Sequence, residues 1–174
     1  HKTEIMSAPA IHTEQKKRAN KIINIRTLMA TGAGFIPIPM LDAASILSIQ
    51  LWMIRDISRV YDIPFKKHRV KSLIGTLVGN IGTVGIIKMI PGLGSLLGGG
   101  AVATGGAAAT YALGKIFTQH FHQGGTLLNF DPVRSQEHFR QLYEEGTASV
   151  KELQQQETGF KEVSTQAEAS TIAL

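Results

Sequence analysis

The stretch most suggestive of chemistry is a glycine-rich run at residues 92–98, GLGSLLG. A glycine-rich turn that opens a helix can present backbone N–H groups to a phosphate. This run lacks the Gly-Lys-Ser/Thr ending of a phosphate-binding loop, and no strand is predicted before it. We therefore interpret its glycines as helix-packing residues rather than as a nucleotide site.

Histidine, cysteine and carboxylate side chains form no recognisable catalytic or metal site in the sequence. His120 and His122 are two positions apart, so on a helix they point in roughly opposite directions, and no carboxylate lies close to them. The chain has no cysteine, which excludes disulfides, thiolate nucleophiles and zinc sites built on sulfur. No serine has the context of a nucleophile elbow. We predict a protein that is not an enzyme, with no catalytic residue, metal or cofactor.

The densest positive charge lies in residues 66–71, where Lys66, Lys67, Arg69 and Lys71 are clustered. Such a cluster suits the phosphates of nucleic acid or those of anionic lipids. Aromatic residues that could stack on bases are sparse around it, whereas long uncharged stretches flank it. The sequence therefore favours a membrane surface over nucleic acid, and these four residues are the predicted lipid contacts.

The composition also favours a membrane. The 174 residues are enough for one domain with a core. The net charge is +5, and the charged fraction of 18% is below the usual quarter or so of soluble domains. The first eleven residues contain no apolar run of signal-peptide length, so we expect no export signal there.

Two proline-containing elbows divide the apolar part of the chain. The first, at residues 34–42, contains Pro37 and Pro39, which fix φ and push the residue before each out of the helical region. Asp42 follows, where it can cap a new helix. A second Ile-Pro step ends at Pro91. We therefore expect helices at residues 13–34, 41–61, 71–90 and 93–117.

The predicted helix at residues 41–61 carries no charge from residue 43 to residue 54, and apolar side chains surround its axis. A helix of this kind is buried in protein or in lipid. Twelve uncharged residues are short of the roughly 20 that a bilayer span needs, so a core helix or a shallow insertion is expected. Gln50 would then be enclosed and should find a hydrogen-bond partner.

Small residues form one face on each helix of the second predicted hairpin, residues 71–117. The first stripe, Gly75, Gly79 and Gly82, has i, i+4, i+7 spacing. Glycine costs about 1 kcal/mol relative to alanine inside a helix, so three on one face imply close helix packing. We predict that the two stripes pack on each other and support self-association. The second stripe consists of Gly94, Gly98, Ala101, Gly105, Ala108 and Ala112.

The C-terminal part reads as an amphipathic helix at residues 131–156 and a polar, flexible tail at residues 157–174. Asp131 and Pro132 have the types expected of a helix cap and a first helical residue. We therefore predict an all-α protein: two antiparallel helical hairpins form a four-helix core within residues 13–125, followed by this helix and tail. The basic segments 16–21, 55–59 and 66–71, together with Lys115, would share one end of the bundle, with the elbows at the other.

The first elbow and the helix after it resemble the YcjF-like family, a bacterial domain of unknown function that is often fused C-terminally to Era-like GTPase domains. The resemblance covers about residues 19–125. It rests on residues 36–42, followed by Gln50, Met53, Ile54 and Tyr61, and on the glycine-rich hairpin. It implies an α-helical, membrane-associated module with no established catalytic residue. A GTPase acting in trans is one partner that it leaves open.

Two functions stay open at this point. In the first, the chain is a membrane-associated helical module that self-assembles through its glycine faces. Its basic end would face the cytoplasm at the bacterial cytoplasmic membrane, and the hairpin at residues 71–117 would insert or lie at the surface. In the second, the chain is a soluble, cytoplasmic scaffold or interaction protein, including an adaptor for a GTPase. A homo-oligomer is expected in both, because two long uncharged helices would overfill a small monomer's core.

Overall fold

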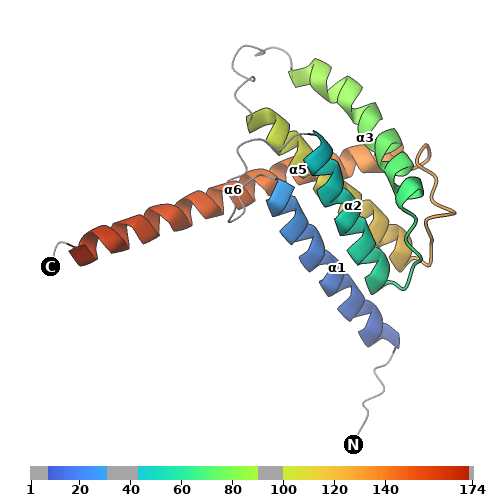
Figure 1. Cartoon of the computed structure of the whole chain (residues 1–174), viewed down its shortest axis with the longest axis horizontal. Coiled ribbons are helices and arrows are strands. Elements are labelled where there is room, and N and C mark those ends of the chain that lie inside the picture. The colour runs from blue at the N-terminus through green and yellow to red at the C-terminus, as the bar shows by residue number, and fades with distance from the viewer. Residues whose placement is uncertain (1–7, 31–42, 90–99, 173–174) are drawn as a thin grey trace, which may run out of the picture.

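The computed structural model describes residues 8–30, 43–89 and 100–172, and every regular element within these ranges is an α-helix (Figure 1). The all-α prediction is therefore confirmed. The helices are α1 (Ala8–Ala30), α2 (Ala43–Val60), α3 (Lys67–Met89), α5 (Gly100–His122) and α6 (Gln136–Ile172). The predicted elbow residues Pro37, Pro39, Asp42 and Pro91, and the packing residues Gly94 and Gly98, lie outside the described residues.

The core lies where α1, α2 and α5 meet, and α5 packs on both of the other helices. α1 and α2 run side by side in opposite directions, as predicted for the first hairpin (Figure 1). The fully buried side chains here include Ile23 from α1, Met53 and Ile57 from α2, and Leu113 and Phe117 from α5. The uncharged stretch of α2 is thus a core helix, as one of the two predicted alternatives required.

The predicted tight hairpin between the two small-residue stripes is wrong at Gly75 and Gly79. Both are exposed on α3, and a Cβ added to either would meet no heavy atom of the described residues within 4 Å. α5 packs most extensively on α6 instead, and α3 lies at the edge of the bundle against α2 and α6. The physical reason is that α6 covers the small face of α5. Gly82 and Ala101 lie on α3 and α5 respectively.

Close helix packing in the described core depends on other glycines. A Cβ on Gly114 of α5 would lie 2.5 Å from Cγ1 of Ile23, and a Cβ on Gly146 of α6 would lie 2.8 Å from the carbonyl oxygen of Ala108. Gly105, from the predicted second stripe, faces α6 as well, because a Cβ there would lie 3.3 Å from the Tyr143 hydroxyl. Small residues on α5 therefore bring α1 and α6 close to it.

The chain turns between α5 and α6 with the signals that the sequence contains. Gly124 has a φ of 86°, and the N–H of Gly125 donates to the carbonyl of His120 over 2.9 Å. Asp131 Oδ1 accepts hydrogen bonds from the N–H groups of Val133 at 3.0 Å and Arg134 at 3.1 Å, a capping interaction ahead of α6.

α6 is much longer than predicted. The segment predicted to be a flexible tail is helical through Ile172. Its glutamates, glutamines and alanines favour a helix, although its composition supplies little for a core. Figure 1 shows the C-terminal half of α6 running out past the other helices.

The three basic segments and Lys115 lie toward one end of the bundle, as predicted, and Lys115 of α5 donates to the Asn20 side chain of α1 over 3.1 Å. The Gln15 side chain of α1 donates to the carbonyl of Val60 at the end of α2 over 3.1 Å. The hydroxyl of Tyr61, just after α2, lies 3.5 Å from Nδ1 of His122 at the end of α5. α3 begins at the same end, at Lys67.

Candidate functional site

Two hollows border α2 and α3, and they share the face on which α3 carries its lysines. The smaller, which we call the basic hollow, has a volume of about 180 Å³. The larger, which we call the apolar cavity, has a volume of about 640 Å³. The basic hollow is lined by Ser48, Leu51, Trp52, Arg55, Phe65 and Lys67. The apolar cavity is lined by Ile46, Leu47, Gln50, Lys71, Ile74, Gly75, Val78, Gly79, Ile81, Gly105, Gly106, Ala109 and Tyr143.

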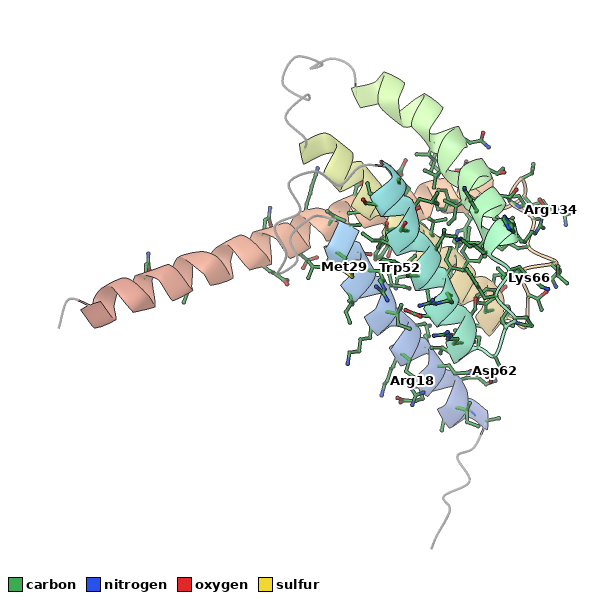
Figure 2. All side chains as sticks on the ribbon, in the orientation of Figure 1. Arg18, Met29, Trp52, Asp62, Lys66 and Arg134 are labelled. Carbon is green, nitrogen blue, oxygen red and sulfur yellow. The ribbon has the colours of Figure 1, made fainter. Side chains whose placement is uncertain are left out.

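The basic hollow combines an exposed tryptophan with cations. Trp52 is 47% exposed although α2 contributes several fully buried side chains to the core, and Figure 2 labels it on α2, with Lys66 ahead of α3. Arg55 Nε makes no hydrogen bond to any described residue, and it lies 3.6 Å from Oδ1 of its neighbour Asp56. Lys67 borders the hollow from the first turn of α3 and is exposed. The hollow thus places an indole ring beside two cationic side chains at the surface.

Three of the four predicted lipid contacts are exposed, and the fourth has a structural role. Lys66, Lys67 and Lys71 are exposed. Arg69 instead turns toward the connection between α5 and α6, where its Nε donates to the carbonyl of Leu127 and a terminal nitrogen donates to that of Phe130, both over 3.2 Å. We therefore remove Arg69 from the predicted lipid contacts, because its guanidinium is engaged by backbone oxygens.

The apolar cavity is open to the surface and is lined by side chains and glycine backbone from four helices. Gln50 is its main internal polar group: it is 3% exposed, and its amide nitrogen donates to the Thr110 hydroxyl over 3.2 Å. The predicted enclosure and pairing of Gln50 are therefore confirmed. Tyr143 borders the cavity from α6, and burial raises the pKa of its hydroxyl. The cavity is suited to an apolar ligand group, because nearly all of its other walls are aliphatic.

A single stripe on α3 joins the two hollows. Lys67, Lys71, Gly75 and Gly79 follow one another at four-residue intervals, which places them along one side of the helix. Lys67 borders the basic hollow, and the other three border the apolar cavity. Along this side of α3, cationic side chains in the first turns are therefore followed by glycines, which expose the backbone.

The histidines have different neighbours, as their spacing predicts. His120 Nε2 lies 2.8 Å from the carbonyl oxygen of Thr126 and 2.9 Å from the side-chain oxygen of Asn129. The ring of His122 instead packs edge-on to that of His12, with 5.3 Å between centroids. Within residues 8–30, 43–89 and 100–172, no group of three or more histidines, aspartates and glutamates could hold a metal ion.

Sequence reasoning missed two parts of this site. In the sequence, Trp52 is one of the apolar residues that surround the axis of α2, and only its position one turn before Arg55 indicates an exposed place beside a cation. The cavity could not be predicted from the sequence because it depends on α6, which packs on α5 and contributes Tyr143. The spacing of residues within one helix does not show which other helix packs against it.

None of the described helices contains a stretch both long and apolar enough to cross a bilayer.

Comparisons with known proteins identify relatives of the chain. The family model described as "Domain of unknown function (DUF697)" matches residues 3–156. A protein of Magnetospirillum gryphiswaldense, "Magnetosome membrane protein 22", is 31% identical over 138 residues, which cover 75% of this chain and 71% of the relative. No solved structure matches the chain.

Proposed function

Given that the chain belongs to the DUF697 family of domains of unknown function, we propose that it is a non-enzymatic helical module that associates with the surface of a membrane. The relative from Magnetospirillum gryphiswaldense is named as a membrane protein, which supports a membrane location for this chain. The family description names no activity, so the surface chemistry of the bundle must carry the rest of the proposal.

The observation that carries the proposal is the exposed Trp52 between Arg55 and Lys67. Tryptophan is enriched at the level of lipid headgroups, because its ring is apolar and its N–H is polar. Cationic side chains beside it are attracted to anionic lipids, at about 1 kcal/mol for each lysine or arginine close to the surface. An indole flanked by two cations therefore suits the headgroup region of an anionic membrane.

The basic end of the bundle extends the same chemistry. Lys66 is exposed beside the basic hollow, and Lys16, Lys17 and Lys21 are exposed on α1 near the shared end. Positive charge of this kind faces the cytoplasm in bacterial inner-membrane proteins. We therefore propose the cytoplasmic face of the bacterial cytoplasmic membrane as the surface that the basic end contacts.

Vesicle binding tests this proposal. Replacing Arg55 and Lys67 together by glutamine removes two attractions of about 1 kcal/mol each, so binding to vesicles rich in phosphatidylglycerol should weaken roughly 30-fold. The matched control replaces Arg140 and Lys151 of α6 by glutamine, which lowers the net charge equally at exposed positions outside the hollow. The measurement is co-sedimentation at a fixed salt concentration. Equal loss of binding in both double variants, or no binding by the wild type, would refute the proposal.

One observation favours a second function, that of an interaction module. The C-terminal half of α6 extends beyond the bundle (Figure 1), and long helices in water depend on packing for most of their stability. We propose that this half of α6 is where a partner helix binds. A second copy of the chain is the first candidate, and the resemblance to the YcjF-like family makes a GTPase in trans another. Ending the chain after residue 156 should then convert an oligomer to a monomer, as measured by the molar mass in light scattering. Vesicle binding should stay unchanged.

A further inference from the structure

We propose that the apolar cavity holds one acyl chain of an anionic phospholipid, whose phosphate is bound by Lys71 and Lys67 on the same side of α3. This inference rests on the proposed membrane function and deepens it. A surface contact would then become the specific recognition of a single lipid molecule.

The size and lining of the cavity suit a chain of methylene groups. Its volume of about 640 Å³ lies within the range of about 300–1,000 Å³ that is typical of small-molecule sites. Ile46 and Leu47 from α2 and Ile74 and Val78 from α3 form aliphatic walls. The amide nitrogen of Gln50 already donates to the Thr110 hydroxyl. An apolar ligand can therefore bind beside Gln50 without leaving that nitrogen unpaired.

The lysines beside the cavity indicate which end of a ligand should be anionic. Lys71 borders the cavity and is exposed, and Lys67 lies one helical turn earlier at the basic hollow. Within the described residues, neither lysine forms an ion pair with a carboxylate. A ligand with an anionic head and an apolar tail would therefore place its head on the lysines and its tail beside Gly75. A membrane phospholipid has that shape and is abundant where we propose that the protein acts.

A packed helix from a second copy fits the same space less well. A helix about 10 Å across and 5.4 Å per turn occupies roughly 400 Å³ for each turn, so the cavity would admit about one and a half turns. Stable protein interfaces bury about 1,200–2,000 Å² in total, which needs a much longer contact. A single flexible chain requires no such area, and it can follow a narrow space beside glycine backbone.

Binding of a short-chain phospholipid, below its micelle-forming concentration, tests the proposal without a bilayer. We expect the full chain to bind dihexanoyl phosphatidylglycerol in isothermal titration calorimetry, and to bind dihexanoyl phosphatidylcholine more weakly. Gly75→Leu fills the cavity and should abolish the heat of binding. Gln141→Leu is the matched control, because Gln141 is exposed on the N-terminal half of α6 and borders neither hollow. Circular dichroism verifies that both variants remain helical.

A charge variant tests the headgroup assignment separately. Lys71→Gln should weaken the binding of dihexanoyl phosphatidylglycerol about fivefold and leave that of the phosphatidylcholine unchanged. Lys151→Gln, on α6, should change neither. Equal binding of the two lipids by the wild type, or equal or tighter binding of decanoate, would overturn the assignment of an anionic phospholipid.

The outcomes separate this inference from the proposed function. If the wild type co-sediments with anionic vesicles but gives no heat with the short-chain lipid, the cavity proposal fails and surface association stands. If it does neither, both fail. If Gly75→Leu instead converts an oligomer to a monomer in light scattering, and no lipid binds, a second copy occupies the cavity and the proposal is overturned. Calorimetric binding that is lost in Gly75→Leu, with vesicle binding retained, supports it.

Discussion

At the scale of single residues, lysine and arginine within the same basic run have different tasks. Lys66 and Lys67 extend from the surface, whereas the planar guanidinium of Arg69 donates to two backbone carbonyls, those of Leu127 and Phe130. A guanidinium can reach two acceptors in fixed directions, and a single ammonium is less suited to that geometry. Arg69 therefore holds the connection that leads into α6, and its neighbours remain available to a ligand.

Replacing Arg69 tests that division of tasks. Arg69→Gln should lower the free energy of unfolding by about 1–3 kcal/mol, because two partly buried carbonyls lose a charged donor. Lys66→Gln, three positions away and exposed, should change it by less than about 0.5 kcal/mol. Urea denaturation followed by circular dichroism measures both. Similar stabilities of the two variants would contradict the structural role of Arg69.

Tyr111 gives the fold a dependence on alkaline pH. Its hydroxyl donates to Glu145 over 2.6 Å, and burial, followed by that carboxylate, raises the pKa of Tyr111 from 10.0 to about 12. The folded state therefore keeps a proton that the unfolded state begins to release near pH 10. The associated stability is fully present below pH 10 and is lost as the pH rises through about 12.

We expect Tyr111→Phe to reduce this dependence. Between pH 10 and pH 12, the free energy of unfolding of the wild type should fall more steeply than that of the variant, since phenylalanine has no proton to release. Chemical denaturation at pH 8, 10 and 11.5 measures both slopes, and lysine titration is common to the two proteins. Parallel slopes would show that Tyr111 does not titrate as the contact with Glu145 requires.

At the scale of elements, α6 closes the bundle through Gly146. The missing side chain lets α6 approach the backbone of α5, because a Cβ there would lie 2.8 Å from the carbonyl oxygen of Ala108 and 3.0 Å from the ring of Tyr111. A backbone oxygen within a packed helix cannot easily move aside. Glycine disfavours a helix interior, but Gly146 is required for the packing of α6 on α5.

Two glycines of α6 should respond oppositely to the same substitution. Gly146→Ala should destabilise the protein by about 1–3 kcal/mol through overpacking against α5. Gly159→Ala should be neutral or stabilising by up to about 1 kcal/mol, because alanine favours the helix and its Cβ meets no described heavy atom within 4 Å. Thermal unfolding monitored at 222 nm distinguishes them. A stable Gly146→Ala would show that α5 and α6 are not in close contact.

Local signals in the sequence predicted the elements better than their partners. The uncharged run of α2 and the cap at Asp131 are both properties of neighbouring residues, and both appear in the structure. The small face of α5 correctly indicated close packing, but a stripe of small residues does not specify which helix covers it. α6 covers it rather than α3, and that choice also leaves the cavity beside Gly75.

The candidate site was predictable to a similar extent. The basic run indicated Lys66, Lys67 and Lys71 through its charge density, and all three are exposed, whereas their contact with lipid stays a prediction. Trp52 was not marked, since an apolar residue on an apolar helix gives no sign of whether it is inside or outside. The fate of Arg69 depended on a loop about 60 positions away, which no local pattern contains.

At the scale of the whole molecule, charge and apolar surface are arranged along one direction. The basic segments of α1, α2 and α3 and Lys115 of α5 lie toward one end of the bundle, and the stripe on α3 leads from that end to the apolar cavity. An anionic membrane would meet lysines and Trp52 first, and an apolar compartment lies immediately behind them. This arrangement unites the proposed surface association with the proposed lipid site.

The emission of Trp52 tests the central claim most directly, because it is the only tryptophan in the chain. We expect vesicles containing phosphatidylglycerol to shift the emission maximum to shorter wavelength as the half-exposed indole enters the headgroup region, and vesicles of phosphatidylcholine alone to have little effect. The shift should diminish as salt screens the lysines. An unchanged emission maximum at saturating anionic vesicles would contradict the account.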